Sequence, residues 1–146
     1  EYNLLTQGGN MNREILFRAK CFGNWRNGNY VHFDKKPTNS RCNINYKDFI
    51  ITNEDDGEHH YPITEPSSIG QYTGLKDKNG KKIFEGDIVT GRNCRFVVKY
   101  DERKAEFVAV NSTLPKGFGL SMSQTWINGT NKIICGNIHD NPELMK

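Results

Sequence analysis

The segment that decides the fold lies in the second half of the chain, where residues 94–110 read CRFVVKYDERKAEFVAV. Strict alternation puts aromatic and apolar side chains on one face of a strand, with Arg95 and Lys99 on the other. The polar residues 101–104 turn the chain, and residues 105–110 return it as a partner strand. The sequence therefore predicts an antiparallel β-hairpin at this point.

A second turn signal precedes that hairpin. Residues 76–82 contain the step Asn79-Gly80, and Asn-Gly between apolar runs is the strongest short-range hairpin signal. The pair Gly86-Asp87 then forms a corner before the apolar residues 88–89. We expect a second hairpin here, followed by a sharp change of direction.

The remaining composition also favours strands. The chain has 27 β-branched residues (Ile, Val and Thr) but only 13 Ala, Leu and Met, so strand formers outnumber the best helix formers. Short strands separated by turns predict a mainly β chain that forms a small closed or nearly closed barrel. The acidic residues 53–60 are expected to form a solvated turn. Further strands are expected at residues 13–20, 28–33, 45–52, 69–72, 126–127 and 133–138.

Length and hydropathy limit the class of protein. A chain of 146 residues fits one compact domain, or a small domain with an ordered extension. The longest purely apolar run has four residues, 107–110, too few for a membrane-spanning helix, and no secretory signal is visible. We expect a soluble intracellular protein. Residues 1–10 are interpreted as a leader or expression scar before a natural start at Met11, with a native extension as the alternative.

The positive charge is concentrated in one segment. The net charge is +3, and residues 76–104 hold nine basic and five acidic side chains. This segment is a candidate for nucleic-acid binding, with Tyr72, Phe84 or Tyr100 as stacking platforms. The alternative is a solvated hairpin with an edge strand protected by lysines, and the isoelectric point of 8.7, below the value of about 9 typical of dedicated nucleic-acid domains, favours that alternative. The candidate phosphate contacts are Arg92, Arg95, Lys99, Arg103 and Lys104.

The cysteines do not predict a metal site. Cys21, Cys42, Cys94 and Cys135 are separated by 21, 52 and 41 residues, without any Cys-x-x-Cys pair. Structural zinc sites use close ligand pairs, and disulfide frameworks belong to exported proteins. We expect four buried or half-buried thiols with a structural role.

The histidines provide weak candidates for chemistry. His59-His60 follows four acidic residues and could bind a divalent cation adventitiously, but a solvated turn is the favoured interpretation. The pair His139-Asp140, or His32 with a carboxylate, could serve as a general base. Because no nucleophile or metal motif accompanies them, we expect no catalytic residues, no metal and no cofactor.

Three segments resemble a known family. Residues 70–89 read GQYTGLKDKNGKKIFEGDIV and resemble the signature of the YopX family of bacteriophage and prophage proteins. Residues 11–19, MNREILFRA, resemble the start of that family, and residues 136–144, GNIHDNPEL, resemble its end. The resemblance implies a phage origin and an SH3-like β-barrel over residues 67–146. We expect a β-rich N-terminal portion, residues 11–66, to pack on this barrel or to extend it.

The resemblance implies no reaction, since the family's biochemical role is uncharacterised. We therefore expect a non-enzymatic binding or assembly module in the cytoplasm of a bacterial host, without a membrane association. A homo-oligomer formed through edge strands and an unidentified protein partner are the candidate interactions, and a nucleic acid is the alternative partner. Within the signature segments, the side chains to inspect for a functional role are Gln71, Tyr72, Lys76, Asp87 and Asn137.

Overall fold

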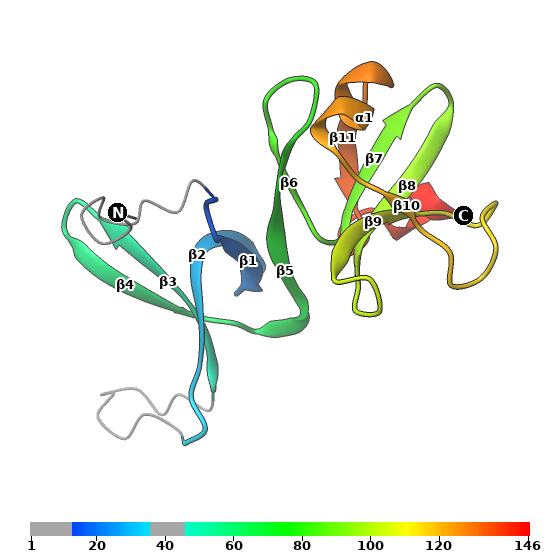
Figure 1. Ribbon diagram of the computed structural model, residues 1–146. Coiled ribbons are helices and arrows are strands. Elements are labelled where there is room, and N and C mark those ends of the chain that lie inside the picture. The colour runs from blue at the N-terminus through cyan, green and yellow to red at the C-terminus, as the bar shows by residue number, and fades with distance from the viewer. Residues whose placement is uncertain (1–12, 36–45) are drawn as a thin grey trace, which may run out of the picture.

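The computed structural model describes residues 13–35 and 46–146. The described chain is mainly β, with two antiparallel sheets and one short α-helix (Figure 1). Its elements are β1 (Phe17–Cys21), β2 (Asn24–His32), β3 (Asp48–Glu54), β4 (Gly57–Pro62), β5 (Glu65–Lys76), β6 (Lys82–Phe84), β7 (Asp87–Gly91), β8 (Cys94–Asp101), β9 (Glu106–Val110), β10 (Leu120–Ser121), α1 (Gln124–Gly129), β11 (Ile133–Asn137) and the 3-10 helix η1 (Pro142–Met145).

The first sheet has six strands in the order β4-β3-β2-β1-β5-β6. The long strand β2 pairs with β1 through its first half and with β3 through its second half. The small core of this sheet consists of Ala19, Cys21, Ile50 and Ile63. The β3–β4 hairpin projects from this sheet to the end of the molecule that lies farthest from the C-terminal half (Figure 1).

The second sheet has five strands in the order β10-β9-β8-β7-β11. The hairpin predicted at residues 94–110 is confirmed, with Val98 opposite Ala109 and Tyr100 opposite Phe107. Of the closed or nearly closed barrel that we expected, the closed form is not present: among the described residues β10 and β11 are the two edges of the sheet, and no ladder joins them. The reason is that β10 has only two residues and pairs on one side alone, with β9.

The Asn-Gly hairpin of the signature segment is confirmed as β5 and β6. The buried Asp77 carboxylate organises its turn: Oδ1 accepts the backbone N–H groups of Asn79 and Lys81 at 2.8 and 2.9 Å. Oδ2 accepts the N–H of Ile134 at 3.1 Å, so the same carboxylate attaches the turn to β11. Gly80 has φ +82°, a conformation that favours glycine at this turn.

Strands β5 and β6 connect the two sheets. Strand β5 pairs with β1 through Gly70 and Gln71, and with β6 through Tyr72. The sequence predicted a C-terminal portion that begins at residue 67. The structure shows that β5 and β6, which lie mostly in that portion, are also strands of the first sheet. Ile83 of β6 packs into the main core with residues of the second sheet and of α1. That core comprises Ile83, Val89, Phe96, Val98, Ala109 and Ile127.

Two elements differ from the sequence-based expectation. Residues 57–62, expected within or beside a solvated turn, form strand β4, because their backbone pairs with β3 from Glu54↔Gly57 to Phe49↔Pro62. Residues 126–127, expected as a strand, lie in helix α1. Ser123 caps that helix by accepting the N–H of Trp126 at 3.1 Å, and burial of Ile127 anchors it to the core.

A nearly buried ion pair joins the two sheets. Arg18 of β1 donates from Nη2 to Oδ1 of Asp87 at the start of β7, at 2.6 Å, and the two side chains are 12% and 2% exposed. The Asp87 carboxylate also accepts the N–H of Phe84 at 2.8 Å. The guanidinium lies over the rings of Trp25 and Phe84, 4.6 and 4.9 Å from their centroids.

The C-terminal turn strengthens this junction. Asp140 accepts hydrogen bonds from Trp25 Nε1 at 2.7 Å and Asn137 Nδ2 at 2.9 Å, and it pairs with Lys20 at 2.5 Å. These three donors hold the pKa of Asp140 well below its ordinary value. No helix in the described part of the chain is long and apolar enough to cross a membrane.

Candidate functional groove

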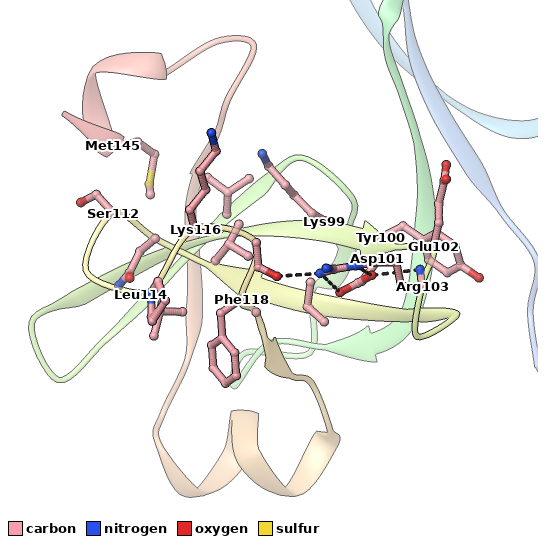
Figure 2. A pocket seen from close by; sticks show the side chains of 17 residues that line it. Lys99, Tyr100, Asp101, Glu102, Arg103, Ser112, Leu114, Lys116, Phe118 and Met145 are labelled. Carbon is pink, nitrogen blue, oxygen red and sulfur yellow. Dashed lines mark hydrogen bonds and ion pairs between the residues drawn. The ribbon is translucent and has the colours of Figure 1, made fainter.

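A cavity lies on the outer face of strands β8 and β9. It has a volume of about 860 Å³, and we call it the β8–β9 groove (Figure 2). The outer face arises from strand alternation, since Phe96 and Val98 enter the core while their neighbours Val97 and Lys99 face the groove. The loop of residues 111–119 and Met145 of η1 form its rim.

The floor of the groove is apolar. Cross-strand pairs place Val97 opposite Val110 and Lys99 opposite Val108, and Val97 and Val108 are only 7% and 3% exposed. The 111–119 loop approaches this floor closely at Gly119, where a Cβ atom would lie 2.7 Å from the Val108 side chain. Only glycine allows the loop this close to β9.

The loop holds its shape through local hydrogen bonds. Asn111 Oδ1 accepts the backbone N–H and the hydroxyl of Thr113, at 3.1 and 2.8 Å, which makes an Asx turn. The Phe118 N–H donates to the carbonyl of Pro115 at 2.9 Å. The result is a shaped rim that leaves Phe118 50% exposed.

One arginine attaches the loop to the β8–β9 turn. Arg103 Nη2 donates to the carbonyl of Gly117 at 2.6 Å, and the guanidinium also pairs with Asp101 at 3.3 Å. The hydrogen bond with Arg103 lowers the pKa of Asp101 and raises the pKa of Arg103. Arg103 therefore holds the loop in place, and the negative charge of Asp101 partly compensates its positive charge.

Two cations of the groove are free of ion pairs within the described part of the chain. Lys104 pairs with Glu106 at 3.6 Å and lies 5.6 Å from the ring of Phe118. Lys99 and Lys116, by contrast, make no ion pair with any described residue. Figure 2 shows both of these side chains projecting to the same side of the β8–β9 ribbon.

The five cations proposed from the sequence lie on β8 and in the turns at its two ends. Lys99 and Arg103 line the groove, and Lys104 lies beside it against Phe118. Arg95 lies four residues before Lys99, about 13 Å along the strand, and donates to the carbonyl of Leu144 at 3.3 Å. Arg92 lies in the β7–β8 turn, at the opposite end of β8 from Arg103. The structure thus brings together only part of the proposed set.

The three aromatic residues proposed as stacking platforms differ in how exposed they are. Tyr72 and Phe84 are 5% and 4% exposed and pack on each other in the interior, so neither can stack on a ligand. Tyr100 is 43% exposed and lines the groove. Sequence reasoning missed Lys116 and Phe118. The available signal was an exposed aromatic residue between Gly117 and Gly119, in a segment that resembled an ordinary loop.

Of the five side chains singled out in the signature segments, Tyr72, Asp87 and Asn137 have structural contacts. Asp87 and Tyr72 are buried, and Asn137 Oδ1 accepts the N–H groups of His139 and Asp140 at 3.0 and 2.9 Å. Gln71 is half-buried in β5, and Lys76 is exposed.

The histidine candidates form no catalytic relay in the described residues. The Asp140 carboxylate is occupied by Lys20, Trp25 and Asn137, and His139 is half-buried against Trp25 with a ring separation of 5.8 Å. Burial and the nearby charges of Arg18 and Lys20 lower the pKa of His139. His32 is exposed and bonds to Asp48 at 2.7 Å.

The cysteine prediction was correct only in part. Cys21 is buried, but Cys94 and Cys135 are exposed, so the expectation of buried or half-buried thiols is wrong for these two. Cys42 lies outside the described residues. In the β3–β4 turn, the ligand atoms of Glu54, Asp56 and His59 lie within 4.8 Å of one another, but Asp56 and His59 already bond to each other at 2.7 Å. We assign no metal to this exposed turn.

These features define a mainly β protein of two antiparallel sheets with an open groove on the outer face of the second sheet. The chain belongs to the YopX family: the family model described as YopX protein matches residues 16–146. No curated protein matches the chain. Among solved structures, the crystal structure of protein EF1440 from Enterococcus faecalis is similar, with 25% identity and a TM-score of 0.52 over 92% of this chain and 99% of that chain.

Proposed function

We propose that this YopX-family protein is a non-enzymatic binding module that takes up an extended, acidic polypeptide segment in the β8–β9 groove. The observation that carries the proposal is the apolar lining of Val97, Val108 and the half-exposed Phe118, beside two lysines that make no ion pair with any described residue, Lys99 and Lys116. An extended segment can bury apolar side chains on such a floor while its carboxylates meet the two ammonium groups.

The balance of charges favours a polypeptide over a polyanion. The lining residues include three cations, Lys99, Arg103 and Lys116, and two acids, Asp101 and Glu102. A phosphate backbone gains affinity with each cation that it contacts, and Arg103 is already bound to Asp101. A segment with a few acidic residues matches two free lysines better than a continuous run of phosphates does.

The proposal includes a phage or prophage origin and a location in the bacterial cytoplasm, both of which rest on the sequence resemblance. It also interprets the C-terminal half as an SH3-like barrel that is left open between β10 and β11. The expected absence of catalytic residues and cofactors belongs to the same proposal.

The test is a selection of displayed random peptides on the purified full chain. We expect enriched peptides to combine Asp or Glu with apolar residues. Their affinity should fall about tenfold or more for the K99E/K116E variant, because each exposed ion pair contributes up to about 1 kcal/mol and reversal adds repulsion. The matched control K76E/K78E changes the same charge at exposed residues outside the groove and should bind normally. Absence of enrichment, or equal loss in both variants, contradicts the proposal.

A second candidate function is single-stranded nucleic-acid binding. It is favoured by one observation: Lys99 and Arg103 share the groove with the exposed rings of Tyr100 and Phe118, and base stacking on such rings is tolerant of sequence. Fluorescence anisotropy with short single- and double-stranded DNA and RNA, at low and physiological salt, tests it. Binding that weakens with salt and is lost in R95E/K99E supports this candidate, and no binding at low salt eliminates it.

A further inference from the structure

The most acidic feature of the molecule lies at its far end from the groove. The β3–β4 turn carries Glu54, Asp55, Asp56 and Glu58 within five residues, and all four are exposed. We call this segment the acidic tip. Residues 53–60 contain no Lys or Arg, so the formal charge of the tip is −4 with neutral histidines.

The tip has a defined shape. Its flanking strands pair without interruption, from Glu54↔Gly57 through Asn53↔Glu58 to Thr52↔His59. Glu54 accepts hydrogen bonds from Thr52 and Tyr61, both at 3.1 Å, and the ring of His59 stacks on Tyr61 at 6.2 Å. The carboxylates are therefore presented on a two-stranded projection that is ordered before it meets a partner, which lowers the entropy cost of binding.

The tip cannot reach the groove of its own chain. The β3–β4 hairpin extends from the outer edge of the six-stranded sheet, and strands β8 and β9, which line the groove, lie in the opposite half of the molecule (Figure 1). A contact between the two surfaces must therefore join two copies.

We propose that the acidic tip of one copy docks into the β8–β9 groove of a second copy, so that the chain assembles head to tail. This inference rests on the proposed function, of which it names the partner. Charge complementarity carries it: the projecting tip holds four exposed carboxylates, two of which (Asp56 and Glu58) also bond to His59 and His60, and the groove holds Lys99 and Lys116, which make no ion pair with any described residue. Electrostatic complementarity of this kind fixes partner and register more than it adds affinity.

The assembly has a specific geometry. The two surfaces are different, so the contact is heterologous, and each copy can both receive a tip and supply one. Copies then propagate into an open chain unless the rotation between them closes a ring. Because the ion pairs lie at the surface, salt weakens the contact.

Light scattering or sedimentation of the full chain over a wide range of concentrations tests the proposal. We expect the average mass to rise with concentration at low salt and to fall when salt is added. The groove variant K99E/K116E and the tip variant D55K/E58K should each remain monomeric, whereas the control K76E/K78E should assemble like the parent chain.

A mixture of these two variants, neither of which should assemble alone, provides the decisive experiment. The reversed groove of K99E/K116E offers two glutamates to the two lysines of the D55K/E58K tip, whose formal charge changes from −4 to 0, while the unchanged tip and groove also match. We expect the mixture to regain mass although each variant alone does not. Self-association that persists in both variants, or a mixture that stays monomeric, overturns the proposal.

Failure of this inference can be distinguished from failure of the proposed function. A parent chain that stays monomeric at every concentration, but whose groove still selects acidic peptides that K99E/K116E does not bind, removes the second copy as partner and leaves the groove as a binding site. A monomeric chain whose groove selects no peptide removes both.

Discussion

Arg18 and Asp87 are 69 residues apart in the sequence, yet they form a 2.6 Å ion pair across the junction of the two sheets. The Arg18 guanidinium lies over the rings of Trp25 and Phe84, and Nε of Arg18 is buried without a partner in the described residues. Burial raises the pKa of Asp87, while the charge of Arg18 opposes that rise. The connection between the halves of the molecule is therefore electrostatic as well as apolar.

Removal of Arg18 should destabilise the protein strongly. R18A leaves the Asp87 carboxylate buried without its cation, and breaking a buried pair in this way costs about 3–5 kcal/mol. Urea unfolding should show this loss. The control K82A removes the exposed pair between Lys82 and Glu14 and should cost no more than about 1 kcal/mol. Equal effects of the two variants would contradict the structural role of Arg18.

Asp77 should stabilise the signature hairpin. D77A removes the acceptor of three backbone N–H groups, those of Asn79, Lys81 and Ile134, and a hydrogen bond to a charged group contributes about 1.5–3 kcal/mol. Thermal unfolding should show a loss of at least about 2 kcal/mol, whereas D55A at the exposed tip should stay within about 0.5 kcal/mol of the parent chain. A neutral D77A variant would refute this account of the turn.

His139 and His59 should change the free energy of unfolding in opposite directions as the pH falls. The pKa of His139 is below its ordinary value of 6.5, so below that pH the unfolded chain binds more protons and stability falls on acidification. The pKa of His59 is raised by Asp56, so its contribution is present below pH 6.5 and is lost as the pH rises through the folded value.

Unfolding temperatures measured between about pH 7 and pH 5 check this difference. H139Q should reduce the loss of stability on acidification, because it removes the group that resists protonation in the folded state. H59Q should increase that loss. Identical pH profiles for the two variants would show that the environments of the two imidazoles do not differ as described.

Arg103 should keep the loop that forms the rim of the groove in place and should contribute little to the global stability. R103A removes the hydrogen bond to Gly117 and the pairing with Asp101, and exposed pairs of this kind contribute about 0–1 kcal/mol. Hydrogen exchange should therefore accelerate in residues 112–118 while the unfolding transition changes little. R103K should not restore protection, since an ammonium lacks the fork that spans both partners. Unchanged exchange in R103A would exclude this positioning role.

The sequence predicted the local parts of the fold well. Alternation at residues 94–110, the Asn79-Gly80 turn and the Gly86-Asp87 corner each act over a few residues, and the structure confirms β8–β9, β5–β6 and the entry to β7. Strand β4 was missed because tertiary pairing with β3 outweighs the weak strand propensity of its polar residues. Helix α1 was missed because Trp126 and Ile127 favour strands, whereas the Ser123 cap and the burial of Ile127 select a helix.

The candidate site was harder to predict for a different reason. Lys99 and Arg103 follow from strand alternation and the turn, so charge pointed to part of the groove. Lys116 and Phe118 join them only because the loop after β9 folds back over Val108, and such long-range packing leaves no periodic signal in the sequence. The Arg18–Asp87 pair escaped prediction for the same reason.

Chemical-shift mapping of the isotope-labelled full chain, titrated with a peptide obtained from the selection, tests the central claim most directly. The account predicts shifts concentrated at Lys99, Val108 and Phe118, with the Arg18–Asp87 junction unaffected, and their loss in K99E/K116E. Shifts centred on the junction, or spread evenly over both sheets, would contradict the β8–β9 groove as the binding surface.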